Sequence, residues 1–339
     1  MRRLHLTRAA RVRILTVLLC LLAAAGLALG RRALVRQLSS QLAWQRWSGG
    51  ESGFSQLGVY YEAGAGPDET TLMQLRQDVD AALAAESLAP ASENARLWFD
   101  AFSAQLTVTL RTDSGTLTAR AIATGGDFFQ FHPLAMRSGW YYSPRDVMQD
   151  QVILDPDAAW ALFGGYDLTG MTLTVNGLTC RVAGVAEKPD GAEGRAYGDT
   201  PTVWLSWDLL KQLTTAPNAS CYEAVLPQPV KDFAKNTLTN ALKLETADGD
   251  RLTQSPKRFS YWQSLRTLAG LSGQLSKNAP LQYPYWENAA RVTQTWCGLL
   301  AALVLLLLLW PLIWLALLII RNVRRLKRRI ALEIQRRKS

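Results

Sequence analysis

Apolar and polar positions alternate most strictly between Met171 and Val182, and the dipeptide Asn176-Gly177 divides this run into two halves. Alternation with a period of two is typical of a strand with one buried face, and an Asn-Gly pair supplies the two positive-φ positions of a tight turn. The pattern therefore predicts a β-hairpin with its turn at Asn176 and Gly177, in which Leu173 pairs with Cys180. One face of this hairpin is apolar and must be covered.

The segment just before the hairpin has the signals of a strand followed by a short helix. Gln151 to Leu154 is a run of β-prone residues, and Asp155-Pro156 is a typical pair for a helix N-cap and the first helical position. Ala158 to Phe163 continues as an apolar helix, which Gly164-Gly165 ends. The sequence thus predicts the order strand, helix and hairpin.

Strand-like and helix-like patterns also alternate elsewhere between the two ends of the chain, which indicates an α+β fold. Glycine and proline predict an exposed loop at residues 188–200 and a turn at residues 247–250. We predict strands at residues 56–62, 98–110, 117–123, 202–205 and 222–226, and helices at residues 68–83, 207–213, 230–242 and 259–275.

Two uncharged apolar runs lie near the ends of the chain, at Ile14 to Leu29 and at Cys297 to Ile320. Crossing the hydrocarbon core of a bilayer takes about 20 apolar residues. The second run is long enough for a transmembrane helix, whereas the first is short. Because arginines precede the first run and small residues at Ala23 to Ala28 end it, a cleavable signal peptide is the alternative to a retained helix.

The net charge of +9 is concentrated beside these two runs. Residues 1–13 contain five arginines, and residues 321–339 contain nine lysines or arginines with one glutamate. The segment between them is net negative, so the basic composition does not predict a nucleic-acid partner. Basic flanks mark the cytoplasmic side of membrane proteins. The distribution predicts a cell-membrane protein with both termini cytoplasmic and residues 31–296 extracytoplasmic.

The sequence shows no pattern of a catalytic, cofactor or metal site. Its two histidines are His5 and His132, and the second precedes Pro133, a context more typical of a packed residue than of a catalytic base. There is no H-E-x-x-H, C-x-x-C or P-loop motif, and no serine lies in a G-x-S-x-G motif. We therefore expect no enzyme activity, no cofactor and no ATPase within this sequence.

Four cysteines follow the same division of the chain. Cys20 and Cys297 lie in or beside the apolar runs, where a thiol usually behaves as a small apolar group. Cys180 and Cys221 lie in predicted external strands, and an external compartment permits a disulfide between them. The alternative is two buried free thiols.

The C-terminal tail combines apolar residues on one side of a predicted helix with basic residues on the rest. One interpretation is a contact with a cytoplasmic partner such as an ATPase. The other is an orientation signal held against anionic lipid. Both interpretations concern the cluster of basic residues Arg321, Arg324, Arg325, Lys327, Arg328 and Arg329.

Several separated motifs together resemble the MacB-like periplasmic core domain of ABC transporter permeases of the MacB and FtsX type. They are Phe128 to Gly139, Asp150 to Leu154, Ala158 to Gly164, Gly170 to Leu173 and Val182 to Val185. The resemblance covers roughly residues 57–226 and implies an extracytoplasmic α+β core flanked by two transmembrane helices. It also implies a retained first helix, connected to the core by a helical segment from Ala33 to Trp47.

Together, the apolar runs, the charges and the resemblance predict seven parts of the chain. The predicted parts are a basic cytoplasmic N-terminus (1–13), transmembrane helix 1 (14–30), a stalk or linker (31–56), the MacB-like core domain (57–226), a helical return segment (227–296), transmembrane helix 2 (297–320) and a basic cytoplasmic tail (321–339).

The resemblance implies a membrane component that couples ATP hydrolysis by a separate ABC ATPase to an extracytoplasmic domain. Family permeases carry further helices in an FtsX-like portion, and this sequence shows one apolar run after the core. We therefore expect a fuller permease subunit as a partner, or a homodimer. The alternative from another class is an anchored extracytoplasmic binding or sensing module without transport activity.

Overall fold

The computed structural model describes residues 8–49, 53–62, 64–90, 92, 95–244, 251–270 and 283–338. The chain forms two compact units. One, which we call the sheet unit, comprises residues 36–260 and 272–293, and the other, which we call the helical unit, comprises residues 1–35, 261–271 and 294–339.

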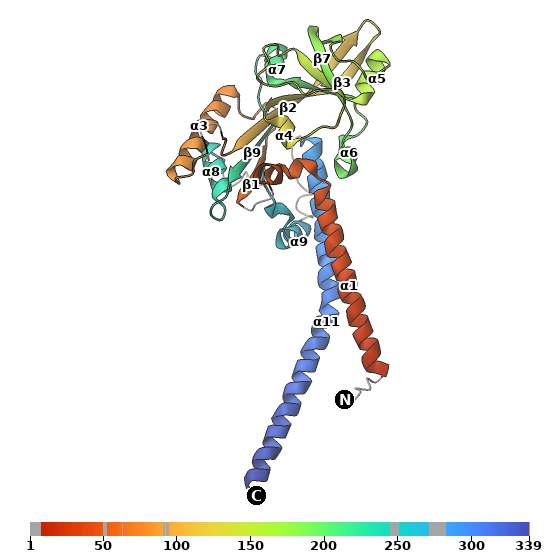
Figure 1. Ribbon diagram of the computed structural model, residues 1–339, viewed down its shortest axis with the longest axis vertical. Helices are drawn as coiled ribbons and strands as arrows, with labels where there is room; N and C mark the ends of the chain where they lie inside the picture. Colours follow the sequence, from red (N-terminus) through yellow and green to blue (C-terminus); the bar gives the residue numbers. More distant parts are fainter. Residues whose placement is uncertain are drawn as a thin grey trace. The chain divides into compact units, whose positions relative to one another are not determined.

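A mixed ten-stranded sheet organises the described part of the sheet unit, in the order β10-β1-β9-β2-β3-β8-β5-β7-β4, with β6 paired to β2 and β7 (Figure 1). The pairs β3 with β8 and β5 with β7 are parallel, and the other pairs are antiparallel. The strands are β1 (Phe54–Tyr60), β2 (Phe99–Thr112), β3 (Gly115–Gly126), β4 (Met136–Gly139), β5 (Gln151–Leu154), β6 (Thr172–Val175), β7 (Leu178–Ala186), β8 (Thr202–Ser206), β9 (Cys221–Pro227) and β10 (Leu252–Ser255).

Short helices cover both faces of this sheet. The helices of the sheet unit are α2 (Ala43–Ser48), α3 (Glu69–Ala85), α4 (Phe128–Phe131), α5 (Pro156–Phe163), α6 (Gly191–Tyr197), α7 (Trp207–Leu213) and α8 (Phe233–Ala241), with 3-10 turns η1 (Ser39–Gln41) and η3 (Lys257–Phe259). Residues of α3, α5, α7 and α8 pack in one buried apolar cluster, which we call the first core cluster. Residues of α2, α4 and α6 pack in another, the second core cluster.

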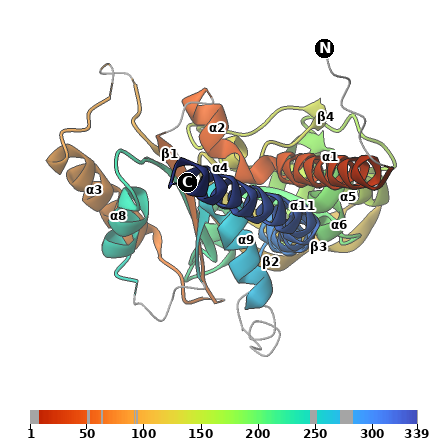
Figure 2. The same cartoon turned by 90° about the horizontal axis from the view of Figure 1, so that it is seen from below.

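Helix α3 forms where the apolar spacing predicts it. The side chain of Asp68 caps it by accepting a hydrogen bond from Thr71 N at 2.8 Å. Its buried face contributes Leu72, Leu75 and Val79 to the first core cluster. Both views show α3 lying beside α8, and the two helices are in contact (Figures 1 and 2).

The predicted hairpin is confirmed. Strands β6 and β7 pair with Leu173 opposite Cys180, and the turn residues Asn176 and Gly177 have φ of 48° and 91°. Asn176 also holds the hairpin against β2, because its Oδ1 accepts from Thr109 N at 2.8 Å. The apolar face of the hairpin lies in the first core cluster.

The strand and helix before the hairpin are confirmed as β5 and α5. Asp155 is the N-cap of α5, and its Oδ1 accepts from Ala158 N at 2.8 Å. Its second oxygen accepts from Tyr197 OH at 3.1 Å, so the cap also connects α5 to α6. Burial raises the pKa of the Asp155 carboxyl above its ordinary value.

Two predictions in this region are wrong. Residues 188–200 are not an exposed loop, because they contain α6, in which Glu193 and Tyr197 are buried. The core also does not end at residue 226, since β10 pairs antiparallel with β1 inside the segment predicted to be helical. The turn predicted at residues 247–250 lies outside the described residues.

The helical unit contains most of α1 (Arg8–Arg36), α9 (Tyr261–Ala269) and α11 (Tyr285–Lys338) from residue 294 onward. Two of the described helices are long and apolar enough to cross a membrane, at Arg11–Arg36 and Tyr285–Arg328. Within this unit, α9 packs on α11, because Tyr261 OH donates to Ala301 O at 2.7 Å. The helix predicted at residues 259–275 corresponds to α9. The predicted end at residue 275 lies outside the described residues.

The predicted helical connection from Ala33 to Trp47 is interrupted. Helix α1 ends at Arg36, and the chain then forms η1 and the separate short helix α2. Polar side chains of the sheet unit bind the backbone at this interruption.

Candidate functional site

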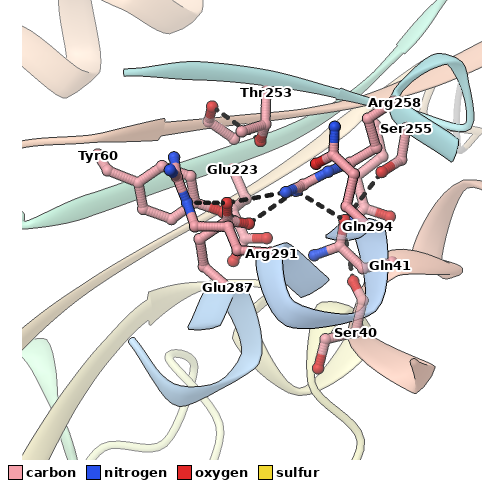
Figure 3. A network of polar contacts seen from close by, with 12 residues as sticks. Ser40, Gln41, Tyr60, Glu223, Thr253, Ser255, Arg258, Glu287, Arg291 and Gln294 are labelled. Atoms are coloured by element: carbon pink, nitrogen blue, oxygen red, sulfur yellow. Dashed lines mark hydrogen bonds and ion pairs between the residues drawn. The ribbon is translucent and has the colours of Figure 1, made fainter. Parts of the chain in front are cut away.

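A buried polar network connects the segment after α1 and the first turns of α11 to strands of the sheet unit (Figure 3). Its centre is Glu287, in the first turn of α11, whose side chain is fully buried. Arg258 in η3 binds both carboxylate oxygens of Glu287, through Nη1 to Oε2 at 2.7 Å and Nη2 to Oε1 at 2.9 Å. Tyr60 OH donates to Oε2 at 3.0 Å, and Arg291 Nε donates to Oε1 at 2.8 Å. One carboxylate therefore accepts four hydrogen bonds.

The same guanidinium reaches the segment that follows α1. Arg258 Nη1 lies 3.4 Å from Gln41 Oε1, and Ser255 Oγ donates to that oxygen at 2.8 Å. Gln41 belongs to η1, and Ser255 ends β10. Figure 3 shows Gln41, Arg258 and Glu287 joined in one connected set of contacts. The segment that follows α1 and the first turn of α11 thus both contact Arg258.

Backbone groups at the interruption are satisfied by buried side chains. Gln56 of β1 donates from Nε2 to Ser40 O at 2.7 Å and accepts from Ala43 N at 3.0 Å through Oε1. Glu193 of α6 accepts from Ser40 N at 3.0 Å and from Ser39 Oγ at 2.9 Å. Because buried backbone groups must be paired, these contacts fix the conformation of η1 and the start of α2.

A second buried pair lies next to this network. His132 Nε2 lies 2.5 Å from Glu223 Oε2, and both side chains are almost fully buried. The imidazole packs against Trp286 of α11, with ring centroids 4.1 Å apart. His132 is thus a packed residue that connects the end of α4 to β9 and α11.

Burial and neighbouring charges shift the pKa values of Arg258 and Tyr60 in this network. Burial lowers the pKa of Arg258, but the Glu287 carboxylate outweighs this effect, and the pKa is raised above its ordinary value. Burial, with the nearby Glu287 charge, raises the pKa of Tyr60 well above its ordinary value. Tyr60 is therefore a neutral hydrogen-bond donor, and Arg258 is a permanent cation.

Nothing in this arrangement activates a nucleophile. Burial, followed by the Glu223 charge, raises the pKa of the Cys221 thiol well above its ordinary value, whereas reactive thiols have a lowered pKa. No cluster of three or more potential metal ligands occurs among the described residues. The site has a structural role, because its contacts hold β1, β9, β10, η1, η3 and α11 together.

The residues singled out by the sequence lie elsewhere. Cys180 belongs to the first core cluster and Cys221 to the second, so the two thiols face opposite sides of the sheet. Both are buried and free, and the disulfide alternative is therefore not what the structure contains. Asn176 and Gly177 form the hairpin turn. The basic residues of the tail are in the part of α11 that belongs to the helical unit.

Sequence reasoning missed the whole network. The available signal was two charged residues next to aromatic ones, in Arg258-Phe259 and in Tyr285-Trp286-Glu287. Charged residues are almost never fully buried unless they are paired, but the identity of the partner cannot be read from a local pattern.

One family model matches most of the chain, and several solved structures are similar to it. The MacB-like periplasmic core domain family matches residues 21–254. The periplasmic region of MacB from Actinobacillus actinomycetemcomitans is 14% identical, with a TM-score of 0.42, over 67% of this chain and 94% of that chain. The extracellular domain of the noncanonic ABC-type transporter YknZ from Gram-positive bacteria is 14% identical, with a TM-score of 0.38, over 59% of this chain and 98% of that chain. No curated protein matches the chain.

The family match covers well over half of the chain, includes every described strand of the sheet except the final residue of β10, and confirms the resemblance noted in the sequence. The family is associated with transporters, and its ABC permeases are membrane proteins that work with ATPases. The chain belongs to the family of MacB-like periplasmic core domain proteins, the extracytoplasmic part of ABC transporter permeases.

Proposed function

We propose that this chain is a membrane-anchored, permease-type component of a MacB-like ABC transporter, and that it couples ATP hydrolysis by a separate ATPase to its sheet unit. In this proposal residues 14–30 and 297–320 span the cell membrane. Residues 1–13 and 321–339 are cytoplasmic, and the core extends to residue 255. A fuller permease subunit or a second copy of the chain completes the transporter.

The observation that carries this proposal is the shared binding of Arg258 to both chain connections. Arg258 contacts Gln41 on the segment that follows α1 and Glu287 on the first turn of α11. A buried ion pair with good geometry resists separation, because breaking it leaves an uncompensated charge. A displacement of either connection would therefore be passed to η3 and β10 instead of being absorbed by a loose linker.

The cytoplasmic end of the proposed coupling is the basic cluster of the tail. The side chains of Arg321, Arg324, Arg325, Lys327 and Arg328 are exposed on α11. Arg329 lies on the same helix. Exposed guanidinium groups can bind carboxylates of a protein partner in a bidentate manner, which lysine cannot do.

We expect the full chain, purified from its native membrane in mild detergent, to carry an ABC ATPase with it. Replacing Arg321, Arg324, Arg325, Arg328 and Arg329 by glutamine should reduce the ATPase recovered by about tenfold or more, as loss of several charge-assisted contacts predicts. Mass spectrometry of the purified material measures this.

A matched variant with lysine at the same five positions keeps the charge, so it separates the two interpretations of the tail. Loss of the ATPase in the lysine variant as well indicates recognition of the guanidinium groups by a protein. Recovery of the chain alone, under conditions that preserve a control transporter, would contradict the proposal. It would leave the anchored binding or sensing module, which an open groove of about 960 Å³ in the sheet unit favours.

A further inference from the structure

Helix α9 packs on α11 within the helical unit, and the two helices lie side by side in both views (Figures 1 and 2). At its first residue, Tyr261 OH donates to Ala301 O at 2.7 Å. In its last turn, Thr267 Oγ1 accepts from Gln294 Nε2 at 2.7 Å. The stretch of α11 from residue 294 to residue 301 rises only about 10 Å. Helix α9 therefore lies at the level where the apolar run of α11 begins, at Cys297.

The contact between these two helices is closest at one glycine. A Cβ on Gly298 of α11 would lie 2.6 Å from Ser264 O and 3.1 Å from Leu268 Cβ. Small residues let two helix backbones approach each other in this way. The position of α9 is thus set by a backbone contact with a residue of the proposed second span.

The outer end of the first proposed span reaches the same helix. Arg31 follows the proposed span at residues 14–30, and its guanidinium carbon lies 5.5 Å from the centroid of the Tyr261 ring. Tyr261 therefore contacts α1 just after its apolar run and α11 just inside the other run. In the proposed topology, both spans leave the hydrocarbon core beside α9.

The exposed face of α9 combines an indole with a cation. Trp262 is 69% exposed, and Arg266, one turn later on the same face, is exposed and makes no ion pair among the described residues. Tryptophan is enriched at membrane–water interfaces, and helices that lie there combine it with arginine. Since α9 runs outward along α11, Arg266 lies nearer to the headgroups than Trp262 does.

The charge at this level is positive. The helical unit contains one acidic residue, Glu333, which follows the second apolar run. Arg31, Arg32 and Arg266 belong to the same unit and lie beside the proposed outer ends of the two runs. Each basic residue near a membrane surface adds to the attraction for anionic headgroups. The composition of the unit therefore favours anionic over neutral lipid next to α9.

We propose that α9 is an interfacial helix that binds anionic phospholipids of the outer leaflet. The Trp262 ring lies at the boundary of the hydrocarbon core, and Arg266 binds the lipid phosphate. This inference rests on the membrane spans of the proposed function, but it does not depend on an ATPase or on a fuller permease subunit.

The position of α9 is tested with the full chain, labelled with fluorotryptophan, in phosphatidylcholine nanodiscs. The Trp262 resonance is identified as the ¹⁹F signal absent from Trp262→Phe. A lipid with its nitroxide near the headgroup should broaden this signal more than a lipid with its nitroxide at the end of the acyl chain. Trp310, half-exposed within the apolar run of α11, is the internal control and should show the opposite order.

The two controls separate this inference from the proposed function. If Trp310 responds as expected and Trp262 responds to neither nitroxide, the spans stand and the interfacial position of α9 is overturned. A protein that covers α9 would give that result. If Trp310 responds to neither nitroxide, residues 297–320 do not span, and both proposals fail.

The choice of lipid is tested with the nitroxide at one fixed position, carried either by phosphatidylglycerol or by phosphatidylcholine. A single basic residue near the surface should enrich the anionic lipid about fivefold. The relaxation enhancement at Trp262 should therefore be larger with labelled phosphatidylglycerol, and Arg266→Gln should remove most of the difference.

Arg145→Gln is the matched control for the change in net charge. Arg145 is also exposed and makes no ion pair among the described residues, but it belongs to the sheet unit. This variant should leave the difference between the two lipids unchanged. Equal enhancement by both lipids in the unmodified chain, or a difference that Arg266→Gln does not reduce, would overturn the assignment of Arg266 to a lipid phosphate.

Discussion

Replacing Glu287 by alanine should lower the free energy of unfolding by about 3–5 kcal/mol, because it removes the buried carboxylate that binds both terminal nitrogens of Arg258. The same change removes one acceptor from Tyr60 OH and one from Arg291 Nε. Chemical denaturation of the full chain in mild detergent, followed by tryptophan fluorescence, measures the loss. A double variant in which methionine replaces both Arg258 and Glu287 should recover a large part of it, since no buried charge of the pair then remains.

Glu69→Ala is the control for this experiment. Glu69 also accepts from a cation, Lys211 at 3.1 Å, but both side chains are about two-fifths exposed. Exposed ion pairs contribute roughly 0–1 kcal/mol. Equal losses for Glu287→Ala and Glu69→Ala would show that the buried network does not stabilise the fold in the way that its geometry indicates.

Gly139→Ala should cost about 2–5 kcal/mol, from two independent penalties. Gly139 has φ of +71°, where an L-residue is disfavoured by about 1–2 kcal/mol. Its Cβ would also lie 2.1 Å from Ala183 O on the neighbouring strand β7, so the edge strand β4 would have to move, at about 1–3 kcal/mol. Denaturation of the full chain under the same conditions gives the combined value.

Gly164→Ala separates these two penalties. Gly164 has nearly the same φ, +68°, but no atom lies within 4 Å of its added Cβ. We expect this variant to lose about 1–2 kcal/mol, from the backbone alone. If both variants lost the same amount, the close approach of Gly139 to β7 would contribute nothing.

Those parts of the fold that depend on neighbouring residues could be predicted from the sequence. The hairpin at Asn176-Gly177, the N-cap at Asp155 and the apolar face of α3 each follow from a pattern within a few positions, and each is confirmed. Local signals were also sufficient for the two apolar helices of the chain.

Two predictions were wrong, the exposed loop at residues 188–200 and the end of the core at residue 226. In each case the local sequence pattern did not indicate the helix or strand that forms there. Gly191 begins α6 and Gly198 follows it, so glycines here mark the ends of a helix and not a loop. Strand β10 has a short and largely polar sequence, Leu252 to Ser255, and it is defined by its pairing with β1. Strand pairing between residues nearly 200 positions apart produces no pattern in the local sequence from which the strand could be predicted.

The candidate site could not be predicted for the same reason. Tyr60 and Glu287 are 227 positions apart, and Gln41 and Arg258 are 217 positions apart. The sequence shows that a glutamate follows two aromatic residues, but it does not show which cation balances it. Conversely, an external compartment permits a disulfide, but Cys180 and Cys221 lie on opposite faces of the sheet as free thiols.

The contact of Arg258 with both Gln41 and Glu287 has a consequence for how such proteins can change. It brings the first segment of the sheet unit, which follows α1, and its last segment, at the start of α11, within reach of one side chain. Domains whose ends lie close together tolerate transfer into a new host. The outermost ends of the sheet unit therefore meet this condition, and a transferred copy of the unit would carry residues 261–271, which belong to the helical unit, as an internal insertion.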